Sequence, residues 1–378
     1  MNHQLKKIML IFGTRPEAIK MCPLVKELQT RQSLKTIVCV TGQHRSMLDQ
    51  VLQAFDVIPD YDLDIMKDRQ DLFDITAAVL DKVKPVLKEV RPSLVLVHGD
   101  TSTAFAAALA SFYLNIPVGH VEAGLRTYNI HSPYPEEFNR EAVGAISSLH
   151  FAPTKPAAEN LIREGKNPES VFVTGNTAID ALKVTVKKDY RHPELEWCHG
   201  SRMILITAHR RENLGAPMHH MFRAIRQVLE EHDDVKAVYP IHLNPLVRQA
   251  AEEVFGEGSP GGREKRMHLI EPLDVLDFHN FLARACLVLT DSGGIQEEAP
   301  SLGIPVLVMR DTTERPEGIT AGTLKLAGTN EETIYSSFTE LLDNQTVWER
   351  MAHASNPYGD GQASVRIADI IEFGKTVR

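Results

Sequence analysis

The sequence lacks the features that mark several broad classes of protein. Its 378 residues contain no run of lysine and arginine, and the formal net charge is −9, so neither a nucleic acid nor an anionic membrane surface is an expected partner. No uninterrupted apolar stretch is long enough to cross a bilayer. Residues 1–7 lack the apolar segment of a signal peptide. We therefore expect a globular protein of the cytoplasm.

Signatures of metals, disulfides and common cofactors are also missing. The four cysteines, Cys22, Cys39, Cys198 and Cys286, form no C-x-x-C pair, and three lie in apolar segments, which favours buried reduced thiols. The 16 histidines show no H-E-x-x-H spacing, so no structural metal is expected. Neither G-x-G-x-x-G after the first strand nor G-x-x-x-x-G-K-[ST] occurs, which argues against tightly bound NAD and against P-loop chemistry.

The stretch at residues 286–300, CLVLTDSGGIQEEAP, has the pattern of an anion site. The apolar run 286–289 predicts a buried strand. The Ser-Gly-Gly segment 292–294 predicts a turn that lets the backbone approach a ligand with no Cβ in the way. A helix predicted to begin near Ile295 would direct its free N–H groups at that turn. Together these elements suit a diphosphate.

Two acids follow the turn in the first helical turn, Glu297 and Glu298. One of them could hydrogen-bond ribose hydroxyls, as an acid does in dinucleotide sites. The alternative is a turn that only connects a strand to a helix. It stays open, because short glycine motifs carry little information by themselves.

Apolar strand patterns alternate with helical patterns along the chain, which predicts an α/β protein with doubly wound parallel sheets. The length suggests roughly two domains, with a boundary near residues 172–178. The expected strands are residues 7–12, 37–40, 94–97, 117–121, 149–152, 171–174, 203–207, 235–240, 268–270, 286–289 and 305–309.

Several segments carry local signals. Thr14 and Glu17 have capping-box spacing at the start of a helix. Pro85 should kink or break the helix expected at 72–90. We expect residues 331–353 to be helical and residues 187–201 to be irregular. Residues 256–263 should form a Gly-rich surface insertion, and 363–373 should form a last helix.

Cations follow the first strand. Arg15 and Lys20 lie near the start of the first helix, at the edge of an open α/β sheet where ligands bind. Two cations beside a helix N-terminus suit a phosphate. A solvated basic turn remains the alternative for both residues.

Acids follow later strands. Asp100 and Glu122 are predicted at the same edge of adjacent strands, where carboxylates can serve as acid and base. Asp100 could instead cap the next helix. Glu136 and Glu137 open another helix, and the helix dipole explains one of the two. A cleft between the two domains would bring such residues to one ligand.

Seven segments resemble the non-hydrolysing bacterial UDP-N-acetylglucosamine 2-epimerases, in order and at family spacing from residue 7 to the last helix. They are 12–20 (FGTRPEAIK), 98–101 (HGDT), 120–127 (HVEAGLRT), 174–176 (TGN), 209–213 (HRREN), 290–300 (TDSGGIQEEAP) and 309–317 (MRDTTERPE).

The resemblance implies a GT-B-like fold with an active-site cleft between two Rossmann-like domains. These would be 1–172, joined by a C-terminal helix at 362–378, and a UDP-binding domain at 173–361. It also implies a homodimer and neither a metal nor a nicotinamide. The family interconverts UDP-GlcNAc and UDP-ManNAc by inverting C2, which supplies N-acetylmannosamine for cell-envelope polysaccharide.

The resemblance also implies roles for single residues. Diphosphate and nucleotide contacts fall on Arg15, His209, Ser292, Gly293 and Gly294. Further substrate contacts are Phe278 on the uracil, Glu298 on the ribose, and Lys20 and Arg315. Residues held important for catalysis are Asp100, Glu122 and Glu136, with His209 beside them. A second UDP-GlcNAc, acting as an allosteric activator, would contact Gln43, Arg69, Glu136, Arg210 and His242. Two positions depart from the family, Ser46 in place of a longer Gln or Glu and Leu273 in place of a polar residue.

The implied chemistry is elimination of UDP to 2-acetamidoglucal, followed by re-addition. Three alternatives stay open within the fold. They are a hydrolysing epimerase that releases free ManNAc and UDP, a GT-B glycosyltransferase that leaves C2 untouched, and a non-catalytic UDP-sugar sensor.

Overall fold

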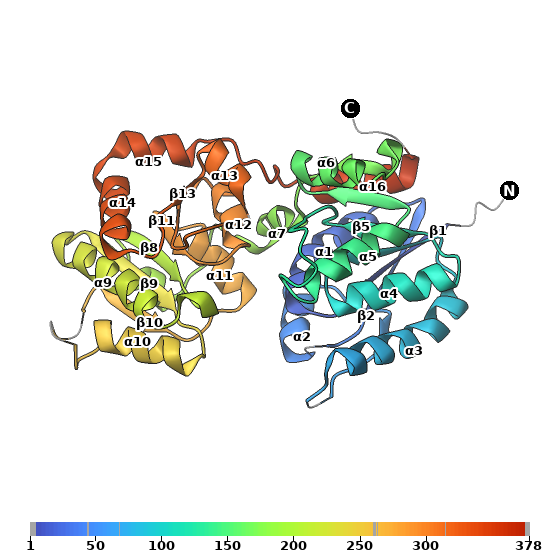
Figure 1. Cartoon of the computed structure of the whole chain (residues 1–378), viewed down its shortest axis with the longest axis horizontal. Coiled ribbons are helices and arrows are strands. Elements are labelled where there is room, and N and C mark those ends of the chain that lie inside the picture. The colour runs from blue at the N-terminus through green and yellow to red at the C-terminus, as the bar shows by residue number, and fades with distance from the viewer. Residues whose placement is uncertain are drawn as a thin grey trace. The chain divides into compact units, whose positions relative to one another are not determined.

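A computed structural model describes residues 5–43, 45–67, 69–259, 262, 264–313 and 315–374. The side chain of Ser46 and the last four residues of the expected C-terminal helix, 375–378, lie outside this description. The chain forms two compact α/β units (Figure 1). Unit 1 comprises Met1–Val184 and Tyr358–Arg378, and unit 2 comprises Thr185–Pro357.

The division at Val184 lies later than the expected boundary at 172, and a buried contact explains the difference. The helix α7 (Thr177–Thr185) carries Asp180, which is 6% exposed. Its two carboxylate oxygens accept the backbone N–H groups of Ala363 and Ser364, over 3.2 and 2.7 Å. Asp180 thus ties α7 to the start of the C-terminal helix within unit 1.

Unit 1 is built on a seven-stranded sheet in the order β3-β2-β1-β4-β5-β6-β7, and its described strand pairs are parallel. Its strands are β1 (Lys6–Phe12), β2 (Leu34–Val40), β3 (Tyr61–Asp62), β4 (Leu94–His98), β5 (Val118–Val121), β6 (Leu149–Ala152) and β7 (Val171–Val173). Its helices besides α7 are α1 (Arg15–Gln29), α2 (Arg45–Ala54), α3 (Leu72–Val90), α4 (Ser102–Tyr113), α5 (Glu136–Ile146), α6 (Lys155–Arg163), η1 (Pro168–Ser170) and α16 (Ala363–Phe373).

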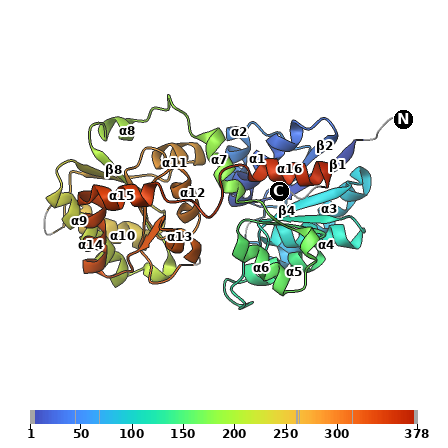
Figure 2. The same cartoon turned by 90° about the horizontal axis from the view of Figure 1, so that it is seen from above.

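Helices cover both faces of this sheet, as the central strands require. The strand β4 is buried along its whole length, which only a sheet covered on both sides allows. Figure 2 shows α1, α2 and α16 on one side and α4, α5 and α6 on the other. Among these helices, α1 contacts α2 and α16, and α4 contacts α3 and α5.

Unit 2 repeats this plan with a six-stranded parallel sheet in the order β10-β9-β8-β11-β12-β13. Its strands are β8 (Arg202–Thr207), β9 (Val235–Pro240), β10 (Met267–Ile270), β11 (Leu287–Thr290), β12 (Val306–Val308) and β13 (Leu324–Leu326). Its helices are α8 (Pro193–Trp197), η2 (Arg211–Asn213), α9 (Ala216–Glu231), α10 (Pro245–Phe255), α11 (Val275–Leu282), α12 (Ile295–Ser301), α13 (Pro316–Ala321), α14 (Glu331–Asp343) and α15 (Gln345–Ala352).

The two faces of the unit 2 sheet have separate cores. Alternate residues of β8 point to opposite faces, because successive side chains of a strand alternate. Ile204 and Ile206 pack with α9, α10 and α14, whereas Met203 and Leu205 pack with α11 and α12. Both sheets are therefore doubly wound, which confirms the predicted fold class.

Three local expectations can be compared with the structure. The helix α3 is not broken at Pro85, since buried residues on both sides of the proline, including Val83 and Leu87, hold it against the core. The expected helical segment 331–353 is confirmed and consists of two helices, because the Asn344 side chain accepts the N–H of Val347 and starts the second one. Segment 187–201 contains the short helix α8. The insertion at 256–263 lies partly outside the described residues.

All four cysteines are free, and Cys22, Cys39 and Cys198 are buried. Within the part of the chain that the structure describes, no helix is long and apolar enough to cross a membrane. The described residues also contain no group of three or more His, Cys, Asp and Glu side chains that could hold a metal ion.

Candidate active site

The loops that follow β1, β4 and β5 lie at one edge of the unit 1 sheet, because these strands are adjacent and parallel. They carry Arg15, Asp100 and Glu122. The first loop is tightly fitted: a Cβ on Gly13 would lie 1.7 Å from Oγ1 of Thr41, so only glycine fits there. The predicted capping box is confirmed, with Thr14 and Glu17 each accepting a backbone N–H of the other.

Asp100 is held by α5. Its Oδ2 accepts from the Arg140 guanidinium, with a 3.1 Å bond from Nε and a second bond from Nη2. Its backbone oxygen accepts from Nδ2 of Asn139 over 2.9 Å. The alternative role of Asp100 as a helix cap is wrong, because Thr101 is the N-cap of α4 and accepts the N–H of Ala104.

Arg140 is itself positioned by Glu137, whose side chain has no solvent exposure. The 3.0 Å pair joins Arg140 Nη1 to Glu137 Oε2. The other oxygen of Glu137 accepts the backbone N–H groups of Thr127 and Tyr128, over 2.7 and 2.8 Å. Glu137 thus fixes both the loop after β5 and the guanidinium that holds Asp100, so more than the helix dipole accounts for this acid.

Glu122 occupies a strained position. Its φ is 63°, a left-handed conformation that costs energy for a residue with a Cβ. Its carboxylate pairs with Lys20 and accepts from Nδ2 of Asn176 over 3.2 Å. Nε2 of His98 lies 3.7 Å from the other oxygen, Oε2. Lys20, which lies on α1, is therefore paired with Glu122, one of the predicted catalytic acids.

Three buried histidines lie in the strands below this edge. Burial lowers the pKa of His98 to about 4, although the nearby Glu122 acts in the opposite direction. Burial lowers the pKa of His120 to about 3, and its Nε2 lies 2.7 Å from the oxygen of Gly99. His150 lies directly across from His120 in β6, and burial lowers its pKa to about 4. All three are neutral at pH 7.

The remaining predicted residues of unit 1 are less tightly placed. Glu136 is half-buried at the start of α5, and its Oε2 is buried without a hydrogen-bond partner among the described residues. Oε1 of Gln43 accepts from the Thr103 hydroxyl over 3.1 Å. Arg69 is exposed and has a φ of 59°.

The matching edge of unit 2 follows β8, β11 and β12, which are adjacent and parallel. The central segment adopts the predicted order: β11, then Ser292-Gly293-Gly294, then α12, which begins at Ile295. Ser292 donates its N–H to the Thr290 hydroxyl over 2.9 Å, which closes the turn.

The two glycines of this turn are not required by backbone geometry. Gly294 has φ −63° and ψ −40°, and Gly293 is likewise outside the left-handed region. A Cβ on Gly293 would approach only the ends of Arg210 and Arg315, at 3.7 and 3.9 Å. The backbone conformation of the turn therefore does not require glycine. The missing Cβ atoms remain consistent with a ligand that approaches the backbone closely.

Asp291 organises the loop after β8. It is fully buried, and its Oδ2 accepts from the backbone N–H groups of His209 and Arg210, both over 2.8 Å, and from Nδ2 of Asn213 over 3.2 Å. The His209 ring is stacked on His242 with ring centres 5.2 Å apart. Burial lowers the pKa of His209, while Asp291 acts against that shift.

Other predicted contacts lie beside the same turn. Arg315 forms an ion pair with Glu297, the acid that precedes Glu298 in the first turn of α12. Oε2 of Glu298 lies 3.6 Å from Nε2 of His279. Phe278 precedes that histidine on α11 and is half-buried against the core.

The structure thus brings the predicted residues together in two groups. Unit 1 gathers acids that are held by cations. Unit 2 gathers backbone N–H groups, arginines and a histidine around a glycine turn.

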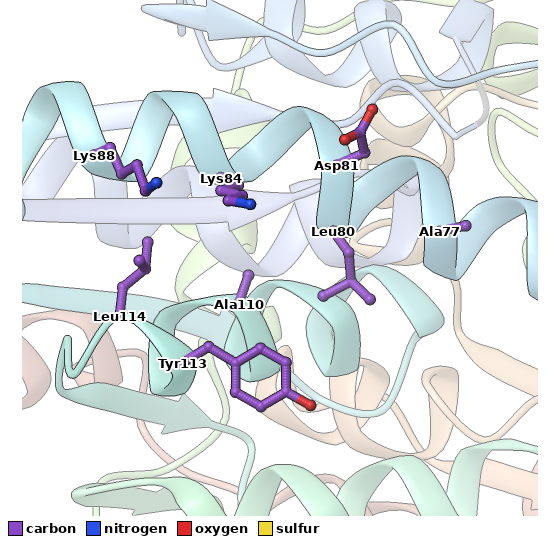
Figure 3. A pocket seen from close by; sticks show the side chains of 8 residues that line it. All are labelled: Ala77, Leu80, Asp81, Lys84, Lys88, Ala110, Tyr113 and Leu114. Carbon is purple, nitrogen blue, oxygen red and sulfur yellow. The ribbon is translucent and has the colours of Figure 1, made fainter.

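A separate cavity of about 540 Å³ lies between α3 and α4 in unit 1 (Figure 3). Its lining combines apolar residues with the charged side chains of Asp81, Lys84 and Lys88. It lies between two helices and contains none of the predicted site residues.

Comparison with known proteins decides the family. A sequence profile described as UDP-N-acetylglucosamine 2-epimerase matches residues 26–372. The chain is 59% identical over 367 residues to the UDP-N-acetylglucosamine 2-epimerase of Bacillus subtilis, which covers 97% of this chain and 95% of that one. The protein belongs to the UDP-N-acetylglucosamine 2-epimerase family.

Solved structures agree with this assignment. The UDP-GlcNAc 2-epimerase of Neisseria meningitidis bound to UDP-GlcNAc has a TM-score of 0.85 at 47% identity, covering 97% of this chain and 99% of that one. The S. aureus MnaA-UDP co-structure has a TM-score of 0.86 at 53% identity, covering 98% and 97%. A glycosyltransferase of kitacinnamycin shares only the fold, with a TM-score of 0.66 at 11% identity, covering 98% and 99%. The epimerase family fold is therefore GT-B-like.

Several residues around the epimerase loops were not singled out from the sequence as functional. Glu137 was considered only for the helix dipole, and Arg140, His98 and Asp291 were assigned no role. The spacing of Arg140 on the helix that begins with Glu136 was an available signal, since residues three or four apart share a helix face. No local pattern could have paired Arg140 with Asp100, forty positions earlier, because that contact depends on how α5 packs on α4.

Proposed function

We propose that this member of the family interconverts UDP-N-acetylglucosamine and UDP-N-acetylmannosamine by inverting C2. The observation that carries the proposal is the pair of ion-paired carboxylates, Asp100 and Glu122, at the ends of adjacent strands. They occur in a chain whose Bacillus subtilis relative at 59% identity is named for this activity.

The reaction requires that the C1–O bond to UDP breaks early. C1 then gains oxocarbenium character, and the proton on C2 becomes removable. A carboxylate takes that proton, and 2-acetamidoglucal remains beside UDP. Return of a proton to the opposite face of C2 and re-addition of UDP complete the inversion. Inversion therefore needs acid/base groups that reach both faces.

We assign the proton transfers to unit 1. Asp100, Glu122 and Glu136 are the candidate acids and bases, and two of them are supported by fixed cations. Arg140 orients the carboxylate of Asp100, and Lys20 orients that of Glu122. A carboxylate held in one orientation transfers a proton more efficiently, because less reorganisation is needed in the transition state.

We assign the leaving UDP mainly to unit 2. Donors placed for the charge that develops on the departing diphosphate stabilise the transition state more than the substrate. These donors are the Ser292-Gly293-Gly294 turn, His209 and Arg315, with Arg15 from unit 1. Phe278 would pack on uracil and Glu298 would bind the ribose.

We also propose a second, activating UDP-GlcNAc that contacts Gln43, Arg69, Glu136, Arg210 and His242. The stacked rings of His209 and His242 support it, because a ligand on His242 would touch a neighbour of the substrate diphosphate. The position of Ser46 lies on α2, and its side chain is outside the described residues.

A homodimer is the expected assembly, and we place it on the α3–α4 surface. Phe73 on α3 and Phe112 and Tyr113 on α4 are 85%, 52% and 69% exposed, and exposed large apolar side chains are typical of interaction surfaces. Asp81 and Lys84 carry opposite charges beside the cavity, so two copies related by a two-fold axis can pair one with the other. The free thiols fit a reducing compartment, which supports a cytoplasmic location.

Incubation with UDP-GlcNAc alone in heavy water, followed by NMR, tests the function. UDP-ManNAc should form, and solvent deuterium should enter at C2. Free UDP and ManNAc accumulating in step with turnover would instead indicate a hydrolysing enzyme. Binding without turnover would indicate a sensor, and transfer to an acceptor with C2 untouched would indicate a glycosyltransferase.

A further inference from the structure

Asp291 has one carboxylate oxygen whose role the loop does not explain. Oδ2 already accepts three hydrogen bonds and thereby fixes the segment that carries His209, Arg210 and Asn213. Oδ1 is buried and has no hydrogen-bond partner among the described residues. A buried carboxylate oxygen without a hydrogen bond costs free energy. A donor is therefore expected among the neighbouring side chains of the site.

The nearest candidate is the imidazole of His209. The distance from His209 Nδ1 to Asp291 Oδ1 is 3.6 Å, just beyond a hydrogen bond. Hydrogen bonds of this kind are often long in a free enzyme and shorten when the ligand binds. The His209 side chain is 42% exposed, so part of the ring is open to a ligand.

We propose that Asp291 is a positioning residue for His209. It keeps the proton on Nδ1 and leaves Nε2 facing the diphosphate oxygens, so that His209 takes up a proton from solvent at Nε2 when UDP binds. The cation formed lies between two anions, the Asp291 carboxylate and the diphosphate. This inference rests on the proposed function, because it requires UDP at the Ser292-Gly293-Gly294 turn.

The charges around His209 determine when the proton is bound. In the free protein burial lowers its pKa, and His242 and Arg210 act in the same direction, whereas Asp291 and Glu212 act against them. Tyr239 lies near Asp291 and stays neutral, because burial and the Asp291 charge raise its pKa. His209 is therefore neutral before UDP binds. An arriving diphosphate adds negative charge at the opposite edge of the ring, which raises the pKa of His209.

The first experiment measures proton uptake. UDP is titrated calorimetrically into the full-length protein in buffers of different ionisation enthalpy, at about pH 8, where the terminal phosphate is already fully ionised because its pKa is about 6. The unaltered protein should take up a substantial fraction of one proton per UDP. Asp291→Asn should bind UDP within about tenfold of normal but with little proton uptake, since one amide oxygen still accepts the loop N–H groups.

Two further variants sharpen the result. His209→Gln should also lose the uptake, while His219→Gln is the matched control, because it removes a histidine paired with Glu253 on the exposed face of α9. The control should keep the uptake. Under catalytic conditions, Asp291→Asn should lower kcat about 100-fold with a smaller change in KM, the pattern of a contact that matters most in the transition state.

The possible outcomes separate this inference from the proposed function. If UDP binds and Asp291→Asn takes up as many protons as the unaltered protein, Asp291 does not position His209. If no protein form binds UDP, the proposed function fails instead. Should Asp291→Asn not fold, nitrogen-15 NMR of the unaltered protein decides the matter. Nδ1 of His209 should carry the proton in the free state, and a proton on Nε2 alone would overturn the inference.

Discussion

The two units share a fold, and each places its loops at the carboxyl edge of its own parallel sheet. The side chains at the two edges have opposite chemical character. In unit 1 the edge presents carboxylates, Asp100 and Glu122, each restrained by a cation. In unit 2 the edge presents N–H donors and cations, and the buried acids there, Asp291 and Glu297, hold the donors in place. Under the proposed function, unit 1 would move protons and unit 2 would hold negative charge.

The difference shows that the fold supplies positions and the loops supply function. Parallel strands end at one edge whatever residues follow them. A carboxylate that a cation fixes at this edge is placed to react with a ligand, as we propose for Asp100 beside Arg140. The same residue type becomes a support when it is buried behind the donors, as Asp291 is. Substitutions in the two units should therefore fail in different ways.

The largest effect is expected for Asp100→Asn in unit 1. Loss of a general acid or base should lower epimerisation by about 10²–10⁴-fold. UDP affinity should stay near normal, because we assign the diphosphate contacts mainly to unit 2. Deuterium exchange at C2 and UDP titration measure the two effects separately. Asp234→Asn, which removes an exposed carboxylate paired with Arg202, is the matched control and should retain activity. Unchanged turnover would remove Asp100 from the mechanism.

The next-largest effect is expected for Glu137, the buried acid that holds the Arg140 guanidinium beside Asp100. Glu137→Ala leaves two backbone N–H groups and the Arg140 guanidinium without their partner, which should destabilise unit 1 by about 3–5 kcal/mol. Glu137→Gln keeps an oxygen for the N–H groups but removes the charge beside Arg140. It should fold and lose about tenfold in kcat. Denaturant unfolding and steady-state kinetics measure these changes.

Glu141→Gln on the same helix is the control for this series and should change neither quantity. If Glu137→Gln matched the control in kcat, the guanidinium would not need Glu137 to hold Asp100.

A third prediction uses three buried histidines of unit 1, whose lowered pKa should make that unit sensitive to acid. The pKa of His98, His120 and His150 is lowered on folding, so each stabilises the folded state above pH 6.5. That stability is lost as the pH falls from 6.5 through about 4 for His98 and His150 and about 3 for His120. His98 and His150 each contribute roughly 3 kcal/mol and His120 roughly 5 kcal/mol.

Glu17 opposes this trend, because burial raises its pKa and its folded form is favoured by protonation. The net loss should still appear first in unit 1. Hydrogen exchange measured between pH 7 and 4 should show β4, β5 and β6 losing protection before the strands of unit 2. His150→Leu should weaken this pH dependence. Simultaneous loss in both units would contradict the assignment to these histidines.

Sequence reasoning succeeded where a feature is local. The capping box of Thr14 and Glu17 depends on four consecutive residues, and the order of strand, glycine turn and helix around 286–300 depends on fifteen. It failed where tertiary packing decides. Pro85 stays inside an unbroken helix because the core holds the residues on either side. The two-residue strand β3 exists only through its pairing with β2.

The candidate site shows the same limit. Motifs nominated Asp100 and Glu122 as candidate acids, but no motif indicated the side chains that hold them. Arg140 reaches Asp100, Lys20 reaches Glu122 and Asp291 faces His209 only after distant segments have packed together. The conformation of Gly293 and Gly294 also lay beyond the sequence, since glycine permits many backbone angles and the residue name does not select one.

The smallest effects compare two glycines within unit 2. Gly303 has a φ of +71°, and a Cβ there would lie 3.3 Å from the oxygen of Ala352, so Gly303→Ala should destabilise the unit by about 1–2 kcal/mol. Gly293 has an ordinary φ, and a Cβ there would make only ordinary van der Waals contacts, so Gly293→Ala should leave stability unchanged or raise it by about 0.4–1 kcal/mol.

UDP affinity should change more in Gly293→Ala than in Gly303→Ala, the reverse of the order expected for stability. The added methyl group of Gly293→Ala would stand where the diphosphate approaches the turn, which should weaken UDP about tenfold, equivalent to about 1.4 kcal/mol. Gly303→Ala should bind UDP normally at a temperature where it is folded. Thermal unfolding with and without UDP measures both quantities in one experiment. A Gly293→Ala protein that kept full affinity would mean that the turn only connects β11 to α12, because no ligand would then need the space that glycine leaves.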